Sequence, residues 1–81
     1  MTIECYGAAR AATGQKAVAV VVADGATVGD ALDALADAHP EFERRRGSDL
    51  VVMRDATHVE EADPVADGDA LSVSNPPMVE D

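Results

Sequence analysis

The chain has 81 residues, 16 acidic and 6 basic, with a formal net charge of −10. This length fits one small domain, because two separate cores would each be too small to fold unaided. A pI near 4.3 excludes non-specific nucleic-acid binding and attraction to an anionic membrane surface, and no apolar run reaches the ~18 residues that a membrane span needs.

The first part of the chain predicts two β-strands. Residues 2–6 alternate with period two and place Ile3 and Cys5 on one face. Residues 8–14 are expected to form a loop with at most one helical turn. Residues 16–23 are rich in β-branched side chains and predict the second strand. Its inward face is expected to carry Val18, Val20 and Val22.

An amphipathic helix is predicted next. Thr27 is a good N-cap, and Asp30 follows three residues later, where a carboxylate favours the positive end of a helix. Pro40 is expected to end the helix. Its apolar face would consist of Val28, Ala31, Leu32 and Leu35. Phe42 is expected to return to the core, while the arginines of the segment 44–46 stay solvated.

The remaining residues predict two more strands. Residues 50–54 form an apolar run, residues 55–63 are polar and expected to be irregular, and a turn at 67–69 leads into a strand over 70–74. Leu71 and Val73 should face inward. The expected fold class is α+β, with one helix packed across a mixed four-stranded sheet in which the last strand lies beside the first.

Three segments carry a family resemblance. They are residues 26–35 with the following His39-Pro40, the turn and strand start at 67–71, and the pair Pro76-Pro77. Together they resemble the MoaD/ThiS branch of the ubiquitin-like β-grasp family, and within it the small archaeal modifier proteins. The resemblance implies a β-grasp fold of order ββαββ over residues 1–75, followed by an extended C-terminal tail over 76–81.

The resemblance also implies a function. Members of this family usually end in a Gly-Gly carboxylate, which an activating enzyme adenylates and which then becomes a thiocarboxylate or an isopeptide. Glycine allows such a tail to thread a narrow channel with no Cβ in the way. Here Glu80-Asp81 stands where the family has its two glycines, so we do not assign the sulfur-donor terminus to Asp81.

Two functions therefore stay open. One is a sulfur carrier or protein modifier that is not itself an enzyme, needs no cofactor, and contacts an activating enzyme or synthase-type subunit through its exposed sheet face and tail. The other is a binding module that docks on a partner without covalent chemistry. We expect a monomer when the protein is free. The residues expected to bind the partner are Pro76, Pro77, Met78, Val79, Glu80 and Asp81.

Other reactive side chains receive simpler explanations. Lys16 is the only lysine and is the candidate acceptor if the protein is itself modified. Cys5 is expected to be a buried strand thiol. His39 and His58 lack metal-ligand spacing, so no metal site is expected. The helix carboxylates are expected to form a solvated face; they are Asp30, Asp33 and Asp37.

The acidity has two explanations. An acidic surface steers a protein toward a basic partner, or it keeps the protein hydrated in a high-salt cytoplasm, such as that of a halophilic archaeon. At molar salt a Debye length of about 3 Å screens the self-repulsion. The even spread of acids favours the second explanation. A single cysteine and a start without an export signal indicate a cytoplasmic location.

Overall fold

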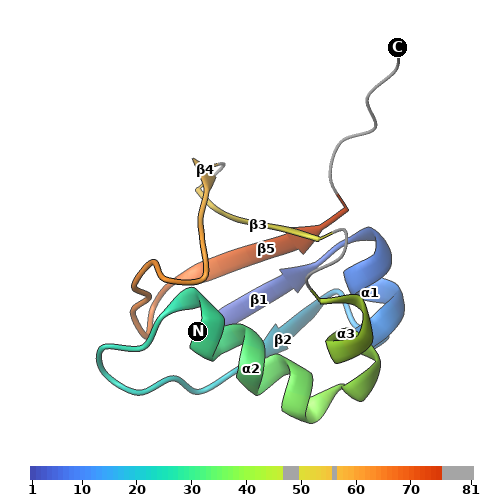
Figure 1. Ribbon diagram of the computed structural model, residues 1–81, viewed down its shortest axis with the longest axis horizontal. Coiled ribbons are helices and arrows are strands. Elements are labelled where there is room, and N and C mark those ends of the chain that lie inside the picture. Colours follow the sequence, from blue (N-terminus) through green and yellow to red (C-terminus); the bar gives the residue numbers. More distant parts are fainter. Residues whose placement is uncertain (47–49, 56, 76–81) are drawn as a thin grey trace.

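The computed structural model describes residues 1–46, 50–55 and 57–75. A mixed sheet of order β2-β1-β5-β3-β4 carries three helices on one face, as Figure 1 shows. The strands are β1 (Thr2–Cys5), β2 (Ala17–Ala19), β3 (Val51–Arg54), β4 (Thr57–His58) and β5 (Ala70–Ser74). The helices are α1 (Gly7–Thr13), α2 (Val28–Ala38) and α3 (Pro40–Arg45). Among the described residues, no helix has the length and apolar character needed to cross a membrane.

The first and last strands form the centre of the sheet. β1 and β5 pair in parallel, with Ile3 opposite Leu71 and Cys5 opposite Val73. All four side chains are buried against the helices, because residues directly opposite each other share a face of the sheet. The predicted inward faces and the predicted place of the last strand beside the first are therefore confirmed.

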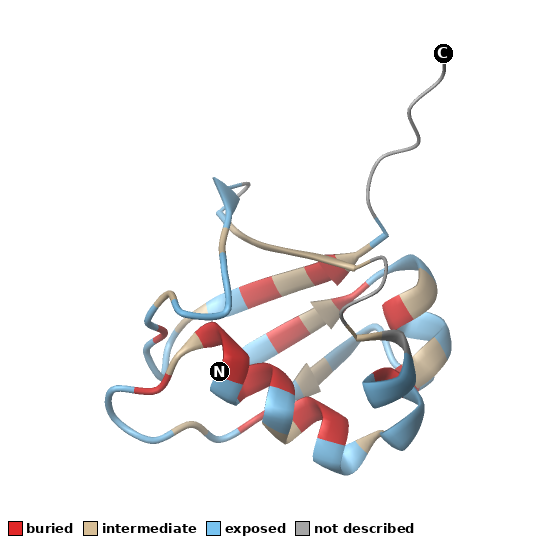
Figure 2. Ribbon diagram, viewed as in Figure 1, coloured by how far each residue is buried: buried red, intermediate tan, exposed pale blue. Residues whose placement is uncertain are grey.

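Helix α2 begins as the sequence predicts. The Thr27 hydroxyl accepts a hydrogen bond from the Asp30 backbone N–H at 3.3 Å, and the Asp30 carboxylate accepts one from the Thr27 N–H at 3.0 Å. This reciprocal capping box satisfies two N–H groups that a helix start otherwise leaves unpaired. The buried stripe along α2 in Figure 2 includes the four predicted residues, Val28, Ala31, Leu32 and Leu35.

Two helices were not predicted. The chain forms α1 where a loop was expected, and the helix ends at Gly14 in the left-handed conformation, with φ of 72°. The chain also resumes a helix directly after the predicted break, because Pro40 occupies the first turn of α3, where its missing N–H costs nothing. Phe42 on α3 is buried in the core, as expected.

The strands differ from the prediction in length and number. β2 covers only residues 17–19 of the predicted 16–23, although the Val20 N–H also donates to the Met1 carbonyl. β4 lies inside the segment expected to be irregular and pairs with β3, with Met53 opposite His58. The sheet therefore has five strands instead of four. The two-layer α+β class is unchanged.

Candidate functional site

The face of the sheet that carries no helices is the open face. Strand register aligns one residue from every strand in a single row across it: Ala17, Glu4, Ser72, Met53 and His58, from β2 to β4. Since directly opposite residues share a face, this row crosses the middle of the open face. Glu4 is its only acid. The row is otherwise small or uncharged, although the chain as a whole is strongly acidic.

The chain leaves the sheet at a fixed point. β1 and β5 run parallel, so both end at the same side, where the Tyr6 N–H donates to the Val73 carbonyl at 2.9 Å. Asn75 follows β5, and its side-chain oxygen accepts a hydrogen bond from the Ala8 N–H at 2.8 Å. The predicted tail, residues 76–81, lies outside the described residues.

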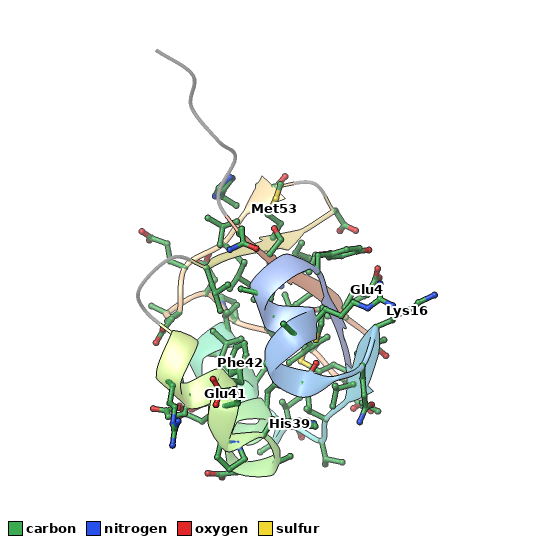
Figure 3. The ribbon with its side chains drawn as sticks, turned by 90° about the vertical axis from the view of Figure 1, so that its right-hand side faces the viewer. Glu4, Lys16, His39, Glu41, Phe42 and Met53 are labelled. Atoms are coloured by element: carbon green, nitrogen blue, oxygen red, sulfur yellow. The ribbon has the colours of Figure 1, made fainter. Side chains whose placement is uncertain are left out.

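Tyr6 and Glu4, at the end of β1, form a pair of hydrogen-bonded polar side chains. The Tyr6 hydroxyl donates to Oε1 of Glu4 at 2.7 Å, and this hydrogen bond, with the charge of Glu4, raises the pKa of Tyr6. Both residues line a shallow hollow of about 550 Å³, together with Arg10 and Lys16. Figure 3 shows Glu4 and Lys16 together, on the side of the molecule away from α3. Lys16 is exposed, which a modification acceptor requires.

The remaining candidate side chains have structural roles. Cys5 is buried as predicted, and its thiol lies 3.7 Å from the Ile3 carbonyl. Asp30 belongs to the capping box and Asp33 pairs with an arginine, so neither of these two carboxylates is free to form a cation site, and Asp37 of the same helix is exposed. Within the described ranges, no group of three or more His, Cys, Asp and Glu side chains is arranged to hold a metal ion.

Arg46 corrects one prediction. The arginines of 44–46 were expected to stay solvated, but the Arg46 side chain is only 16% exposed. Its guanidinium donates to the Gly29 carbonyl at 3.3 Å and pairs with three carboxylates, those of Asp33, Glu43 and Glu61. Burial lowers the pKa of Arg46 and these carboxylates raise it, leaving it above its ordinary value. Arg46 therefore links α2 and α3 to the loop after β4.

A second hollow lies between the helices and the β3–β4 side of the sheet. It encloses about 240 Å³, below the size of most small-molecule sites. Its walls include Leu32 on α2, Phe42 and Arg46 on the α3 side, and Val52 and Val59 around β3 and β4. Sequence reasoning missed this hollow because its residues come from separate elements and share no local pattern.

Comparison with known proteins supports the same grouping. The family model described as the ThiS family matches residues 3–76. No curated protein matches the chain. Three solved structures illustrate the likeness.

The crystal structure of SAMP1 from Haloferax volcanii is 30% identical, covers 98% of this chain and 97% of that chain, and has a TM-score of 0.87. A structure described as H. volcanii small archaeal modifier protein 1 is 31% identical, covers 94% and 95%, and has a TM-score of 0.86. A putative molybdopterin converting factor subunit 1 from Pyrococcus furiosus is 18% identical, covers 94% and 95%, and has a TM-score of 0.83.

The last of these likenesses shows the β-grasp fold alone, while the first two extend to sequence over nearly the full length. The family match spans both the α2 helix and the central strands whose register builds the open face. On this evidence the chain belongs to the ThiS family, within the MoaD/ThiS-type ubiquitin-like proteins.

Proposed function

We propose that this protein is a ubiquitin-like carrier or modifier whose open face and residues 76–81 contact a protein partner, an activating enzyme or a synthase-type subunit. It works in the cytoplasm of a cell with high internal salt. Membership of the ThiS family and the likeness to a small archaeal modifier protein support this assignment. The anchored exit of the chain beside Ala8 gives the tail a defined starting point next to the open face.

The low charge of the open face is the observation that carries the proposal. Interface cores are depleted of charged residues relative to the rest of a protein surface. In a chain with 16 acids, the residues that strand pairing places around Glu4 on this face are uncharged, and the charged side chains that share its hollow, Arg10 and Lys16, are basic. The uncharged neighbours are Thr2, Ala17, Ala19, Met53, Ala70 and Ser72.

Binding measurements test the face directly. Ser72→Glu puts a second carboxylate opposite Glu4 at the centre of the open face. We expect binding to the host activating enzyme, measured by calorimetry, to weaken at least about tenfold, or ~1.4 kcal/mol. Ala11→Glu adds the same charge on the exposed side of α1 and is the matched control. Equal affinities for both variants would exclude the open face as the contact.

A second candidate function follows from Glu80 and Asp81. They replace the two glycines that the family resemblance leads us to expect. Two added side chains obstruct a narrow channel, and their charges repel the phosphates of ATP. The alternative is therefore a binding module that occupies the same partner without covalent activation.

Intact mass measurement separates the two functions. The protein is incubated with the host activating enzyme and ATP, with a Glu80→Gly/Asp81→Gly variant in parallel. A terminal adenylate, thiocarboxylate or lysine conjugate on the natural sequence establishes a carrier. Unchanged mass with measurable binding establishes the binding module. Reaction of the glycine variant alone identifies a carrier that has lost its reactive terminus.

We also propose Lys16 as the position at which a modifier would be attached to this chain. It is the only lysine, and it is exposed beside the hollow that Glu4 and Tyr6 line. Lys16→Arg keeps the charge and removes the nucleophilic amine. Conjugates of this protein in its host should disappear with Lys16→Arg, whereas conjugates that persist on the variant would place the acceptor elsewhere.

A further inference from the structure

β2 is an edge strand of the sheet, and one of its two sides faces away from β1. Among the residues that the structure describes, β1 is the only strand that pairs with β2, and the direction of each backbone group of β2 follows from this ladder. The Cys5 N–H donates to the Lys16 carbonyl at 2.7 Å, and the Val20 N–H donates to the Met1 carbonyl at 2.9 Å. Bonded and non-bonded pairs alternate in an antiparallel ladder. The even-numbered residues from Lys16 to Val20 therefore point their backbone groups toward β1.

The odd-numbered residues point theirs outward. Ala17, Ala19 and Val21 present N–H and C=O groups to the open edge, and no group in the described part of the chain bonds to them. All three are exposed, and Val21 is 91% exposed. We call residues 17–21 the β2 edge.

The β2 edge has defined ends. On one side, Gln15 is already engaged, since its N–H and its carbonyl both bond to the Thr13 hydroxyl. On the other side, the Ala23 carbonyl accepts a hydrogen bond from the Ala26 N–H. Only the backbone groups between these ends remain available to another strand.

The β2 edge also lacks the usual protection against strand pairing. Natural edge strands carry charges, prolines or bulges that discourage a second strand. Residues 17–23 contain alanine and valine alone, and the nearest charges are Lys16 and Asp24 at either end. In a chain this acidic, an uncharged segment of alanine and valine whose outer backbone groups are unpaired is a template for β-strand addition.

We propose that the β2 edge pairs antiparallel with the β2 edge of a second copy of this chain, with Ala19 opposite Ala19. In this register Ala17 lies opposite Val21, so all the outward-facing residues of both copies enter hydrogen-bonded pairs. A shift of two residues in one direction would place Val21 opposite Gln15, whose groups are already engaged. A shift of two in the other direction would place Ala17 opposite Ala23, whose carbonyl already accepts from Ala26, so the register with Ala19 opposite Ala19 forms the most hydrogen bonds.

The end charges favour a second copy in this orientation. With Ala19 opposite Ala19, Lys16 of one copy lies opposite Val22 of the other and diagonal to its Asp24, within reach of a long side chain. The two-fold axis repeats this Lys16–Asp24 pair. A parallel arrangement would instead bring like charges together.

The dimer should depend on salt. Each copy carries a charge of −10, and the Debye length falls from about 10 Å at 0.1 M to about 3 Å at 1 M salt. The β2 edge is also short, so the buried area should fall below the ~800 Å² per partner of a standard interface. We therefore expect the protein to be a monomer in dilute salt, as the sequence predicts, and to form a weak, reversible dimer in molar salt.

Cysteine cross-linking tests the register. In a Cys5→Ala background, Ala19→Cys is compared with Ala17→Cys, in 2 M salt with oxidised glutathione. Cα atoms of a hydrogen-bonded pair lie about 5.5 Å apart, within disulfide range. Ala19→Cys should therefore form a covalent dimer. Ala17→Cys should not, because the offset of four residues separates the two copies of position 17 by more than ~13 Å.

Sedimentation equilibrium tests the contact without cross-linking. Ala19→Pro removes an outward N–H and leaves the β1 ladder intact, and Val21→Lys adds charge to the edge if the proline variant does not fold. Either change should weaken dimerisation at least about tenfold, whereas Ala11→Lys on α1 should leave it unchanged. A wild-type monomer at millimolar protein in 2 M salt, equal linkage at positions 17 and 19, or no linkage at either would overturn the proposal.

Discussion

The side chain of Asn75 caps helix α1, which lies near the opposite end of the sequence. Its oxygen accepts a hydrogen bond from the Ala8 N–H at 2.8 Å, in the first turn of α1. The preceding residue has to be glycine for this contact to form. Gly7 has φ of +53°, and a Cβ at this position would lie 2.1 Å from the Asn75 oxygen. Gly7 and Asn75 therefore depend on each other.

Gly7→Ala should destabilise the protein more than Gly14→Ala. Both positions have positive φ, which costs a residue with a Cβ about 1–2 kcal/mol. A Cβ at position 14 would meet open space. A Cβ at position 7 would also clash with the Asn75 side chain and break its hydrogen bond, so Gly7→Ala should cost about 2–4 kcal/mol in total. Urea unfolding measures both. The difference between the two variants should largely vanish in an Asn75→Ala background, and its persistence there would contradict this account.

The comparison of α1 with α2 explains why only one of these two helices could be predicted from the sequence. The capping residues of α2, Thr27 and Asp30, are three positions apart and were recognised. The capping group of α1 comes from Asn75, 67 positions away, and no local signal announces it. Helices with local caps and strands with alternating cores were therefore predicted, and a helix whose cap depends on the tertiary fold was not.

The site shows the same limit. Arg46 is the last residue of the arginine run 44–46, and nothing in the local sequence indicates that it reaches Asp33 and Glu61. The open face was predicted in general terms, but its row of residues depends on strand register, which includes the unpredicted pairing of Met53 with His58. A period-two pattern indicates which face of the sheet a residue takes, but not which residue of the neighbouring strand lies opposite it.

Arg46→Ala should cost far more stability than Arg44→Ala. The Arg46 side chain is mostly buried, and its removal takes away a hydrogen bond to the Gly29 carbonyl and an ion pair with Asp33, whose own side chain is 64% exposed, at an expected cost of about 1–2 kcal/mol. Arg44 is 80% exposed and pairs with Glu41 at 3.6 Å, a type of contact worth less than ~0.5 kcal/mol. Urea unfolding of the two variants measures the difference. Equal losses would show that the Arg46 pairs contribute nothing beyond a surface contact.

Thermal stability should rise with salt. The chain carries ten excess negative charges, and their repulsion is screened as the Debye length shortens between about 0.1 and 2 M salt. We expect the unfolding midpoint to rise by roughly 5 °C or more, equivalent to ~1 kcal/mol for a domain of this size. Asp37→Lys, at an exposed position on α2, reduces the net charge and should reduce the salt dependence. A midpoint that does not change with salt would argue against a surface adapted to high salt.

The phenol of Tyr6 should titrate above its ordinary pKa, and absorbance can follow it alone because the chain has one tyrosine and no tryptophan. The hydrogen bond to Glu4, and then its charge, raise the pKa of Tyr6 above 10.0. A raised pKa in the folded state stabilises the fold below the pKa of the unfolded chain, and this contribution disappears as pH rises through the folded value. Glu4→Gln should therefore lower the absorbance midpoint of the folded protein toward that of the urea-unfolded chain, while Glu60→Gln, on an exposed loop residue, should not. Identical midpoints for the two variants would show that Glu4 does not raise the pKa of Tyr6.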